Sequence, residues 1–240
     1  MGKGNKVSLQ LSFYDTQALK GLALFMLLCH HCLYEVKGYV DYGFMVTPLF
    51  QTLGIFSKLC VAIFVFLSGY GLTVSTMKNG ELGGILNFYR RRYTKLMVNY
   101  WFIYLLFVPI GICFFSRTFP SVYGEHYVHK AIVDFFGLYQ GVYGNPWGYN
   151  PTWWFYSCII VLDLLYPLIW KCRRYWYLML PLCFIFQTLI VHVPIIRTSG
   201  CDSYVLAFVS GVSLAYLKPQ LGGGKHVWKS PRRSPFTTCM

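Results

Sequence analysis

Residues 96–115 read LMVNYWFIYLLFVPIGICFF, a run of 20 residues without a charged side chain. A helix needs about 20 residues to cross a hydrocarbon layer about 30 Å thick, so this run is long enough to span a membrane. Five other apolar stretches cover residues 18–36, 49–73, 153–170, 176–196 and 204–217, of which the last is the shortest. The sequence therefore predicts an all-α, polytopic transmembrane bundle of about six spans.

The composition of the whole chain agrees with a membrane protein. Of its 240 residues, 56% are hydrophobic and only 12% are charged, whereas charged residues make up about 25% of an ordinary soluble domain. So few charged side chains cannot cover the surface of a soluble globular domain, and so many apolar ones exclude a disordered chain.

The charges that remain are strongly asymmetric, with 21 Lys and Arg against 8 Asp and Glu. When the N-terminus is placed in the cytoplasm, 16 of the 21 basic residues fall on the cytoplasmic side and four on the outer side. Basic residues prefer the cytoplasmic side of membrane proteins, so both termini are predicted to be cytoplasmic. The basic residues alternate with apolar spans and form no continuous patch, which argues against binding of nucleic acid.

The first predicted span carries polar side chains at membrane depth. His31 follows Lys20 by eleven residues, or three helical turns, and Glu35 lies one turn further along the same face. A histidine oriented by a carboxylate is suited to take a proton from an alcohol. The alternative is that His31 only forms a hydrogen bond to a neighbouring helix.

Three consecutive arginines, Arg90, Arg91 and Arg92, precede the span 96–115. Guanidinium groups bind phosphate through paired hydrogen bonds, so this cluster is a candidate site for the phosphates of a donor such as coenzyme A. The alternative, which the cluster taken alone favours, is an orientation anchor on anionic lipid.

Two further charges fall inside predicted spans, Lys58 and Asp163. They either pair with each other or line a polar cavity. No metal site is predicted: Cys29, His30, His31 and Cys32 are adjacent, and adjacent helix residues point in different directions.

The connection between the spans 96–115 and 153–170 is the longest in the chain and lies on the predicted outer face. It is rich in aromatic residues, including Tyr123, Tyr139, Tyr143 and Tyr149. Trp and Tyr concentrate at the level of lipid headgroups, so we expect this segment to rest on the membrane interface, with contact to a sugar ring as the alternative.

Several of these motifs occur together in an order that resembles the acyltransferase 3 family of polytopic membrane acyltransferases. They are Leu19-Lys20-Gly21-Leu22-Ala23, His31, Phe66-Leu67-Ser68-Gly69-Tyr70, Phe88-Tyr89-Arg90-Arg91-Arg92, Trp153-Trp154-Phe155 and Pro167. In this family the first helix typically carries Arg or Lys eleven positions before an essential His. Lys20 and His31 have that spacing, and His30 does not.

The resemblance implies transfer of an acyl group, usually acetyl, from acyl-CoA to a hydroxyl of a cell-surface or lipid-linked carbohydrate at the bacterial cytoplasmic membrane. His31 would then be the base or proton carrier, and Lys20 would help to hold the donor or polarise its path. Arg90, Arg91 and Arg92 would contact the phosphates of coenzyme A, and no metal is implied.

The chain departs from the family pattern in one respect. Family members generally have about ten spanning helices, and six are visible here. After Lys218 the chain becomes rich in Gly, Ser, Pro and basic residues up to Met240. We therefore expect residues 1–217 to be an incomplete acyltransferase domain and residues 218–240 to be a disordered tail. The alternative function is that of a non-catalytic membrane protein, either a transporter fragment or an inactive, truncated paralogue.

Overall fold

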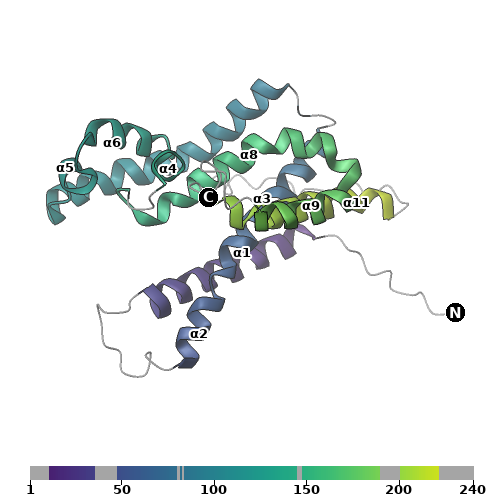
Figure 1. Cartoon of the computed structure of the whole chain (residues 1–240), viewed down its shortest axis with the longest axis horizontal. Coiled ribbons are helices and arrows are strands. Elements are labelled where there is room, and N and C mark those ends of the chain that lie inside the picture. The colour runs from purple at the N-terminus through teal and green to yellow at the C-terminus, as the bar shows by residue number, and fades with distance from the viewer. Residues whose placement is uncertain are drawn as a thin grey trace.

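A computed structural model describes residues 11–35, 48–79, 82, 84–144, 148–189 and 201–221. Every regular element within these ranges is a helix, and the helices pack into one bundle (Figure 1). The prediction of an all-α membrane bundle is therefore confirmed. The predicted tail, apart from residues 218–221, lies outside the described residues, as does the end of the predicted span 176–196.

The bundle begins with α1 (Phe13–His30), which starts in a capping box. The Ser12 hydroxyl accepts a hydrogen bond from the Asp15 amide, and the Asp15 carboxylate accepts one from the Ser12 amide. The hydrogen bond from the Ser12 amide to the Asp15 carboxylate is the largest cause that lowers the pKa of Asp15, and the Ser12 side chain lowers it further. The chain then widens into the π-helical turn η1 (His31–Glu35) and continues with α2 (Pro48–Phe56) and α3 (Leu59–Lys78).

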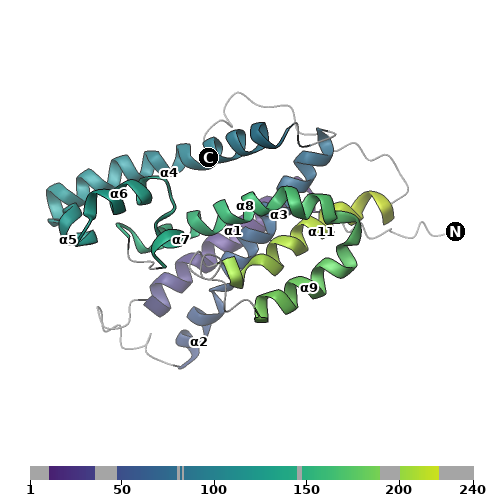
Figure 2. The same cartoon turned by 45° about the horizontal axis from the view of Figure 1, so that its top comes forward.

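The longest helix is α4 (Ile85–Phe115). Short helices follow it, namely α5 (Phe119–Tyr123), α6 (Tyr127–Phe135), α7 (Tyr139–Tyr143) and the 3-10 turn η3 (Pro151–Trp153). The chain then forms α8 (Trp154–Cys172), η4 (Arg173–Tyr175), α9 (Trp176–Leu189), η6 (Cys201–Ser203) and α11 (Val205–Leu221). In Figure 2, α8 runs beside α3, and α9 turns back beside α11.

Among the described residues, three helical stretches are long and apolar enough to cross a membrane: Pro48–Lys78, Ile85–Phe115 and Pro151–Thr188. The first combines α2 and α3, and the third contains both α8 and α9, which the sequence predicts as two separate spans. A shorter apolar stretch, Val205–Leu217, forms most of α11. The helix α1, which covers most of the predicted span 18–36, is not among the three. The arrangement of these helices across a bilayer, including the cytoplasmic termini, stays a prediction.

One half of the bundle is held by a group of buried residues that we call the aliphatic cluster. It joins α3, α8 and α11 to the start of α4 and contains Val65, Leu72, Phe88, Cys158, Ile159, Leu162, Tyr166, Val205, Phe208, Val209 and Val212. Helices α3 and α11 cross closely here because both carry glycine. A Cβ on Gly211 would lie 2.1 Å from the Phe66 carbonyl oxygen, and a Cβ on Gly69 would lie 2.4 Å from that of Phe208. The small residue Gly69 therefore permits close helix packing.

The other half is held by the aromatic cluster, which joins α4 to the segment between α4 and α8. It contains Met97, Tyr100, Tyr104, Val108, Tyr123, Tyr139, Tyr149, Trp153 and Ile160. The expectation that the aromatic residues of this segment rest on the membrane interface is wrong for Tyr123, Tyr139 and Tyr149. Each is buried, because its ring packs against α4 or against the aromatic rings beside it.

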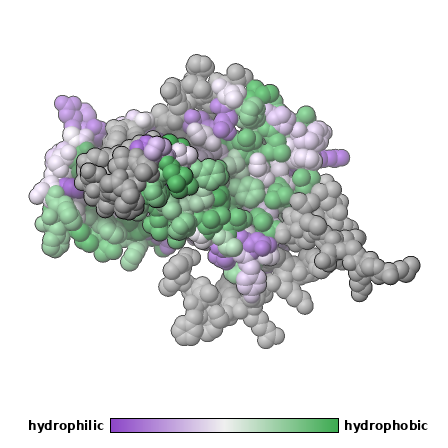
Figure 3. All heavy atoms as spheres, turned by 90° about the horizontal axis from the view of Figure 1, so that it is seen from below, coloured by the Kyte–Doolittle hydropathy of each residue, from purple (hydrophilic) through white to green (hydrophobic). Residues whose placement is uncertain are grey.

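Large apolar side chains also cover much of the outside of the bundle. Those on α4 include Val98, Phe102, Leu105 and Phe114, all of which are exposed. In Figure 3, apolar atoms extend along the lower left-hand edge of the molecule, at the end that holds α4, α5 and α6 in Figure 1. An apolar exterior of this extent is expected of a protein whose surroundings are hydrocarbon rather than water.

Candidate functional site

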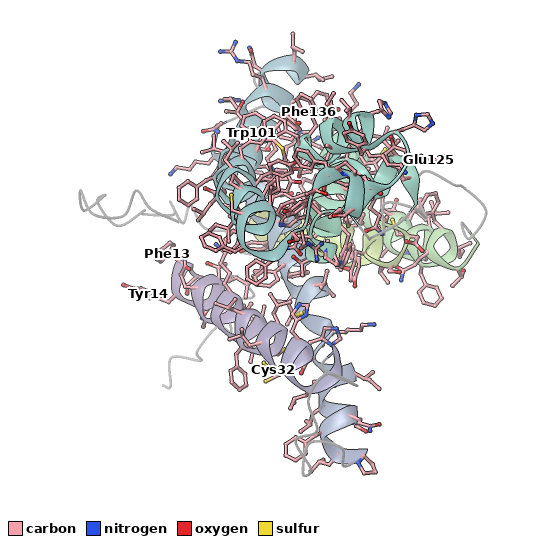
Figure 4. All side chains as sticks on the ribbon, turned by 90° about the vertical axis from the view of Figure 1, so that its left-hand side faces the viewer. Phe13, Tyr14, Cys32, Trp101, Glu125 and Phe136 are labelled. Carbon is pink, nitrogen blue, oxygen red and sulfur yellow. The ribbon has the colours of Figure 1, made fainter. Side chains whose placement is uncertain are left out.

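The candidate residues of the first helix lie along α1 and the π-helical turn that follows it. Lys20 is exposed on α1, and His31 is half-buried as the first residue of η1. Eleven residues of helix separate the two by about 16 Å along the axis. In Figure 4, Phe13 and Tyr14 mark one end of α1, and Cys32, the neighbour of His31, marks the other end.

The π-helical turn changes the expected relation between His31 and Glu35. In an α-helix these residues would share a face, but a π-helix closes its hydrogen bonds five residues on and therefore winds more slowly. The backbone of Glu35 ends η1, and its side chain lies outside the described part of the structure. Short π-helical turns are frequently found at functional sites.

His30, which the sequence analysis did not select, has a clear structural partner. Its ring is buried, and Nδ1 lies 2.8 Å from the carbonyl oxygen of Gly54 on α2. Because a carbonyl can only accept, Nδ1 carries the proton and donates it in this bond. His30 thus makes a hydrogen bond to a neighbouring helix, and the role of His31 stays a prediction. The centroids of the two imidazole rings are 5.4 Å apart, so His30 also lies against the ring of His31.

The three arginines at the start of α4 differ in their surroundings. Arg90 and Arg91 are exposed, and Arg91 Nε donates a long hydrogen bond of 3.3 Å to the Asn87 carbonyl oxygen. Arg92 points into the bundle, where its side chain is 24% exposed. Its Nε lies 2.7 Å from Asp163 Oδ2 on α8, and its Nη2 lies 2.8 Å from Ser68 Oγ on α3. Arg92 therefore ties three helices together.

The partner of Asp163 is therefore Arg92, which belongs to a different helix from Lys58. The Asp163 side chain is only 8% exposed, so the carboxylate of the ion pair is almost fully buried, while Arg92 remains partly exposed. One of its carboxylate oxygens, Oδ1, is buried without a hydrogen-bond partner among the described residues. Buried ion pairs are strongly destabilised when one partner is removed. Lys58 lies at the junction between α2 and α3.

The motif Ser68-Gly69-Tyr70 connects the candidate elements to one another. Ser68 accepts the hydrogen bond from Arg92, Gly69 allows α11 to approach, and Tyr70 donates a 3.3 Å hydrogen bond to the Leu11 carbonyl oxygen just before α1. A serine within an apolar helix was the signal that a polar partner lies opposite.

Within the described part of the chain, no three His, Cys, Asp or Glu side chains gather in a way that could hold a metal ion. His129, one of the histidines in the segment after α4, is in hydrogen-bond contact with the Tyr143 hydroxyl. The polar chemistry of this half of the bundle is dominated by tyrosine instead.

A family model described as an acyltransferase domain, that of acyltransferase 3, matches residues 13–239. No curated protein and no solved structure matches the chain. The matched range includes every residue described above except Leu11 and Ser12.

Proposed function

The chain belongs to the acyltransferase 3 family, and on this basis we propose that it transfers an acyl group, most simply acetyl, from acyl-CoA to a hydroxyl of a cell-surface or lipid-linked carbohydrate. The observation that carries the proposal is the match of the acyltransferase domain over residues 13–239, nearly the whole chain. The apolar helices support a location in a membrane, for which we propose the bacterial cytoplasmic membrane.

In the proposed reaction His31 is the base. It accepts the proton of the acceptor hydroxyl while the hydroxyl oxygen attacks the thioester carbonyl carbon. The C–S bond then breaks, and the coenzyme A thiolate leaves with the proton that His31 has taken. The half-buried position of His31 in η1 and its contact with the His30 ring support this role, because His30 is anchored by the Gly54 carbonyl oxygen and restricts how the His31 ring can turn. We propose Glu35 as the carboxylate partner of His31 and Lys20 as a cation that acts on the donor.

For the donor, we propose that the arginine cluster binds the phosphates of coenzyme A. The exposure of Arg90 and Arg91 supports direct contact, because their guanidinium groups can reach a ligand without breaking an internal ion pair. Arg92 is already bonded to Asp163 and Ser68. Its remaining N–H groups could add to the same phosphate site, with its position fixed from inside the bundle.

The test is to express the chain in a bacterial host that lacks O-acetylated surface glycan and to measure O-acetyl ester by mass spectrometry. We expect ester in the strain that carries the natural sequence. In the His31→Ala strain the rate of ester formation should fall about 10²- to 10⁴-fold, which is the usual contribution of a positioned general base.

The matched control is His126→Ala, because His126 is an exposed histidine outside α1 and η1. Immunoblots of the membrane fraction confirm that the three strains hold equal amounts of protein. Equal ester in the His31→Ala and natural strains would remove His31 from the chemistry. No ester in any strain would instead favour the non-catalytic alternative.

A further inference from the structure

The helix α4 provides a measure of depth for the elements that pack against it. Lys95 and Arg117 flank the uncharged run 96–115. At a rise of 1.5 Å per residue, these 20 residues extend over about 30 Å, the thickness of the hydrocarbon layer. A group that contacts this run between its two ends therefore lies within that thickness. Met97 is the second residue of the run, and Tyr100 and Trp101 are the fifth and sixth.

The segment that follows α4 does not continue outward from its end but turns back along it. Figures 1 and 2 both show α5 and α6 beside the C-terminal half of α4. The Asp134 carbonyl oxygen accepts a 2.6 Å hydrogen bond from the Tyr100 hydroxyl, and a Cβ on Gly137 would lie 3.2 Å from Met97 Cε. Met97 is 18 residues, or about 27 Å, from the end of α4 at Phe115. The chain later returns outward, because the Tyr149 hydroxyl donates to the Val108 and Arg117 carbonyl oxygens.

The backbone carbonyl groups at the end of α6 are hydrogen-bonded, as an environment without water requires. Four consecutive carbonyl oxygens, from residue 134 to residue 137, each accept a hydrogen bond from a side chain of α4 or α8. The donors are Tyr100 to Asp134 at 2.6 Å, Trp101 to Phe135 at 2.9 Å, Tyr93 to Phe136 at 3.2 Å and Ser157 to Gly137 at 2.7 Å. The end of a helix leaves carbonyls without intrahelical partners, and in hydrocarbon each unsatisfied group costs several kcal/mol. In Figure 4, Trp101 and Phe136 lie close together, at the level where α6 meets α4.

The one acidic side chain of α6 is satisfied in the same way. Asp134 is 2% exposed. Its Oδ2 accepts hydrogen bonds from the Tyr123 hydroxyl at 2.5 Å and from the Tyr149 amide at 2.9 Å, and its Oδ1 accepts a longer one of 3.2 Å from the Tyr100 hydroxyl. These bonds gather α4, α5, α6 and the segment before α8 around one carboxyl group, so the segment is held as a unit.

The opposite side of α6 is apolar and uncovered. Val128, Ile132 and Phe136 follow one another at intervals of four residues, which places them on one face, and they are 57%, 52% and 42% exposed. On α4, Val98 and Phe102 are exposed in the same part of the helix that α6 contacts. The polar residues Glu125, His126 and His129 lie near the start of α6, where His126 and His129 border a surface hollow together with Val128 and Ile132.

We propose that residues 116–144 form a re-entrant element, which enters the bilayer from the C-terminal end of α4, turns near Gly137 and presents Val128, Ile132 and Phe136 to lipid acyl chains. The occupant is lipid because the apolar face of α6 continues the exposed apolar surface of α4, a helix long and apolar enough to span a membrane. The proposal concerns topology and does not depend on the reaction assigned above.

The first arm of the test distinguishes water from membrane. Ile132→Cys and Phe136→Cys are compared with Glu125→Cys for reaction with a charged, membrane-impermeant maleimide, and the natural chain provides the background from its own cysteines. Cells and opened membrane vesicles are both labelled, so that either side of the membrane is reached. We expect labelling of Glu125→Cys at least tenfold above that of Ile132→Cys and Phe136→Cys. Equal labelling of all three would place α6 in water and overturn the proposal.

The second arm identifies what covers the apolar face. The benzophenone amino acid p-benzoylphenylalanine replaces Ile132, and the protein is irradiated in host membranes that contain isotope-labelled phospholipid. We expect an adduct with the mass of one labelled phospholipid. Crosslinking to a second polypeptide, either another protein or another copy of this chain, would overturn the assignment of lipid even if the first arm excludes water.

Discussion

The two sides of α4 stabilise buried polar groups in different ways. Beside the aliphatic cluster, the carboxylate of Asp163 is balanced by a formal charge, the guanidinium of Arg92, at 2.7 Å. In the aromatic cluster, Asp134 is surrounded by the uncharged donors Tyr100, Tyr123 and the Tyr149 amide. An ion pair leaves a full charge behind when one partner is lost, whereas a set of neutral donors loses one hydrogen bond at a time. The first arrangement should therefore be far more sensitive to a single substitution.

The largest effect is expected for Asp163→Asn. The change preserves size but leaves Arg92 charged and without a counter-charge, which should destabilise the fold by about 3–5 kcal/mol. Asp134→Asn retains a carbonyl acceptor for the neutral donors and should cost less, about 1–3 kcal/mol. The measurement is the midpoint of thermal unfolding of each purified variant in detergent.

A double substitution at the Arg92–Asp163 pair separates the loss of charge balance from the loss of packing. Arg92→Met combined with Asp163→Leu removes both charges and should recover most of the stability lost in Asp163→Asn, because apolar pairs of similar volume often replace buried ion pairs without loss. If Asp134→Asn proved the more damaging of the two single variants, the distinction between charged and neutral partners would be wrong.

An intermediate effect is expected where glycines allow close contact on each side of α4. Gly211→Ala would place a Cβ 2.1 Å from the Phe66 carbonyl oxygen, a backbone atom of α3 that cannot move alone. We expect a loss of about 1–3 kcal/mol from overpacking. Gly111→Ala would place its Cβ 2.1 Å from the Tyr149 hydroxyl, which is the end of a side chain. This change should cost about 1 kcal/mol, the value of the hydrogen bonds that Tyr149 would give up as it moves.

The midpoint of thermal unfolding in detergent is measured for Gly211→Ala and Gly111→Ala, with Gly71→Ala as the reference variant. No atom lies within 4 Å of a Cβ at Gly71, so this change within α3 should leave stability unchanged or raise it by up to about 1 kcal/mol. Gly211→Ala unfolding at the temperature of the natural chain would show that α3 and α11 do not cross as described.

The smallest effect on stability is expected within the arginine cluster. The same substitutions also test the proposed function. Because Arg91 is exposed, Arg91→Gln should leave the unfolding midpoint unchanged and raise the KM for acetyl-CoA by about tenfold, the loss of one charge-assisted contact to phosphate. Arg92→Gln should lower the midpoint, because Asp163 loses its cation. Initial rates at varied acetyl-CoA separate KM from kcat. An unchanged KM in Arg91→Gln would argue for the alternative role of this residue as an anchor on anionic lipid.

Apolar runs were sufficient to predict the fold class, because a helix is the simplest way to satisfy every backbone group in hydrocarbon. The run 96–115 lies within one continuous helix, α4. The segment after it was harder to interpret, since tyrosines occur both at membrane interfaces and in buried clusters. Tyr123 and Tyr149 are buried because Asp134 offers them an acceptor, and nothing in their spacing along the chain reveals that contact.

For the candidate site, too, the sequence identified the residues but not their contacts. Motif order identified the arginine cluster and His31 as candidates, and their roles stay predictions. Local sequence could not distinguish Arg92 from its two neighbours. That distinction depends on Ser68 and Asp163, which lie 24 and 71 residues away along the chain. Likewise, His30 and His31 are the same residue type, and only the position of the Gly54 carbonyl oxygen shows that His30 forms a hydrogen bond to α2.

The sequence by itself thus determined that this protein is an all-helical membrane protein of the acyltransferase 3 family, because both conclusions follow from local hydropathy and the order of motifs. Only the tertiary structure decided which charges pair, which histidine anchors a neighbouring helix and how the chain after α4 turns back along that helix. Those features depend on contacts between residues far apart in sequence, where the partner of a polar group is set by the packing of helices and not by its neighbours along the chain.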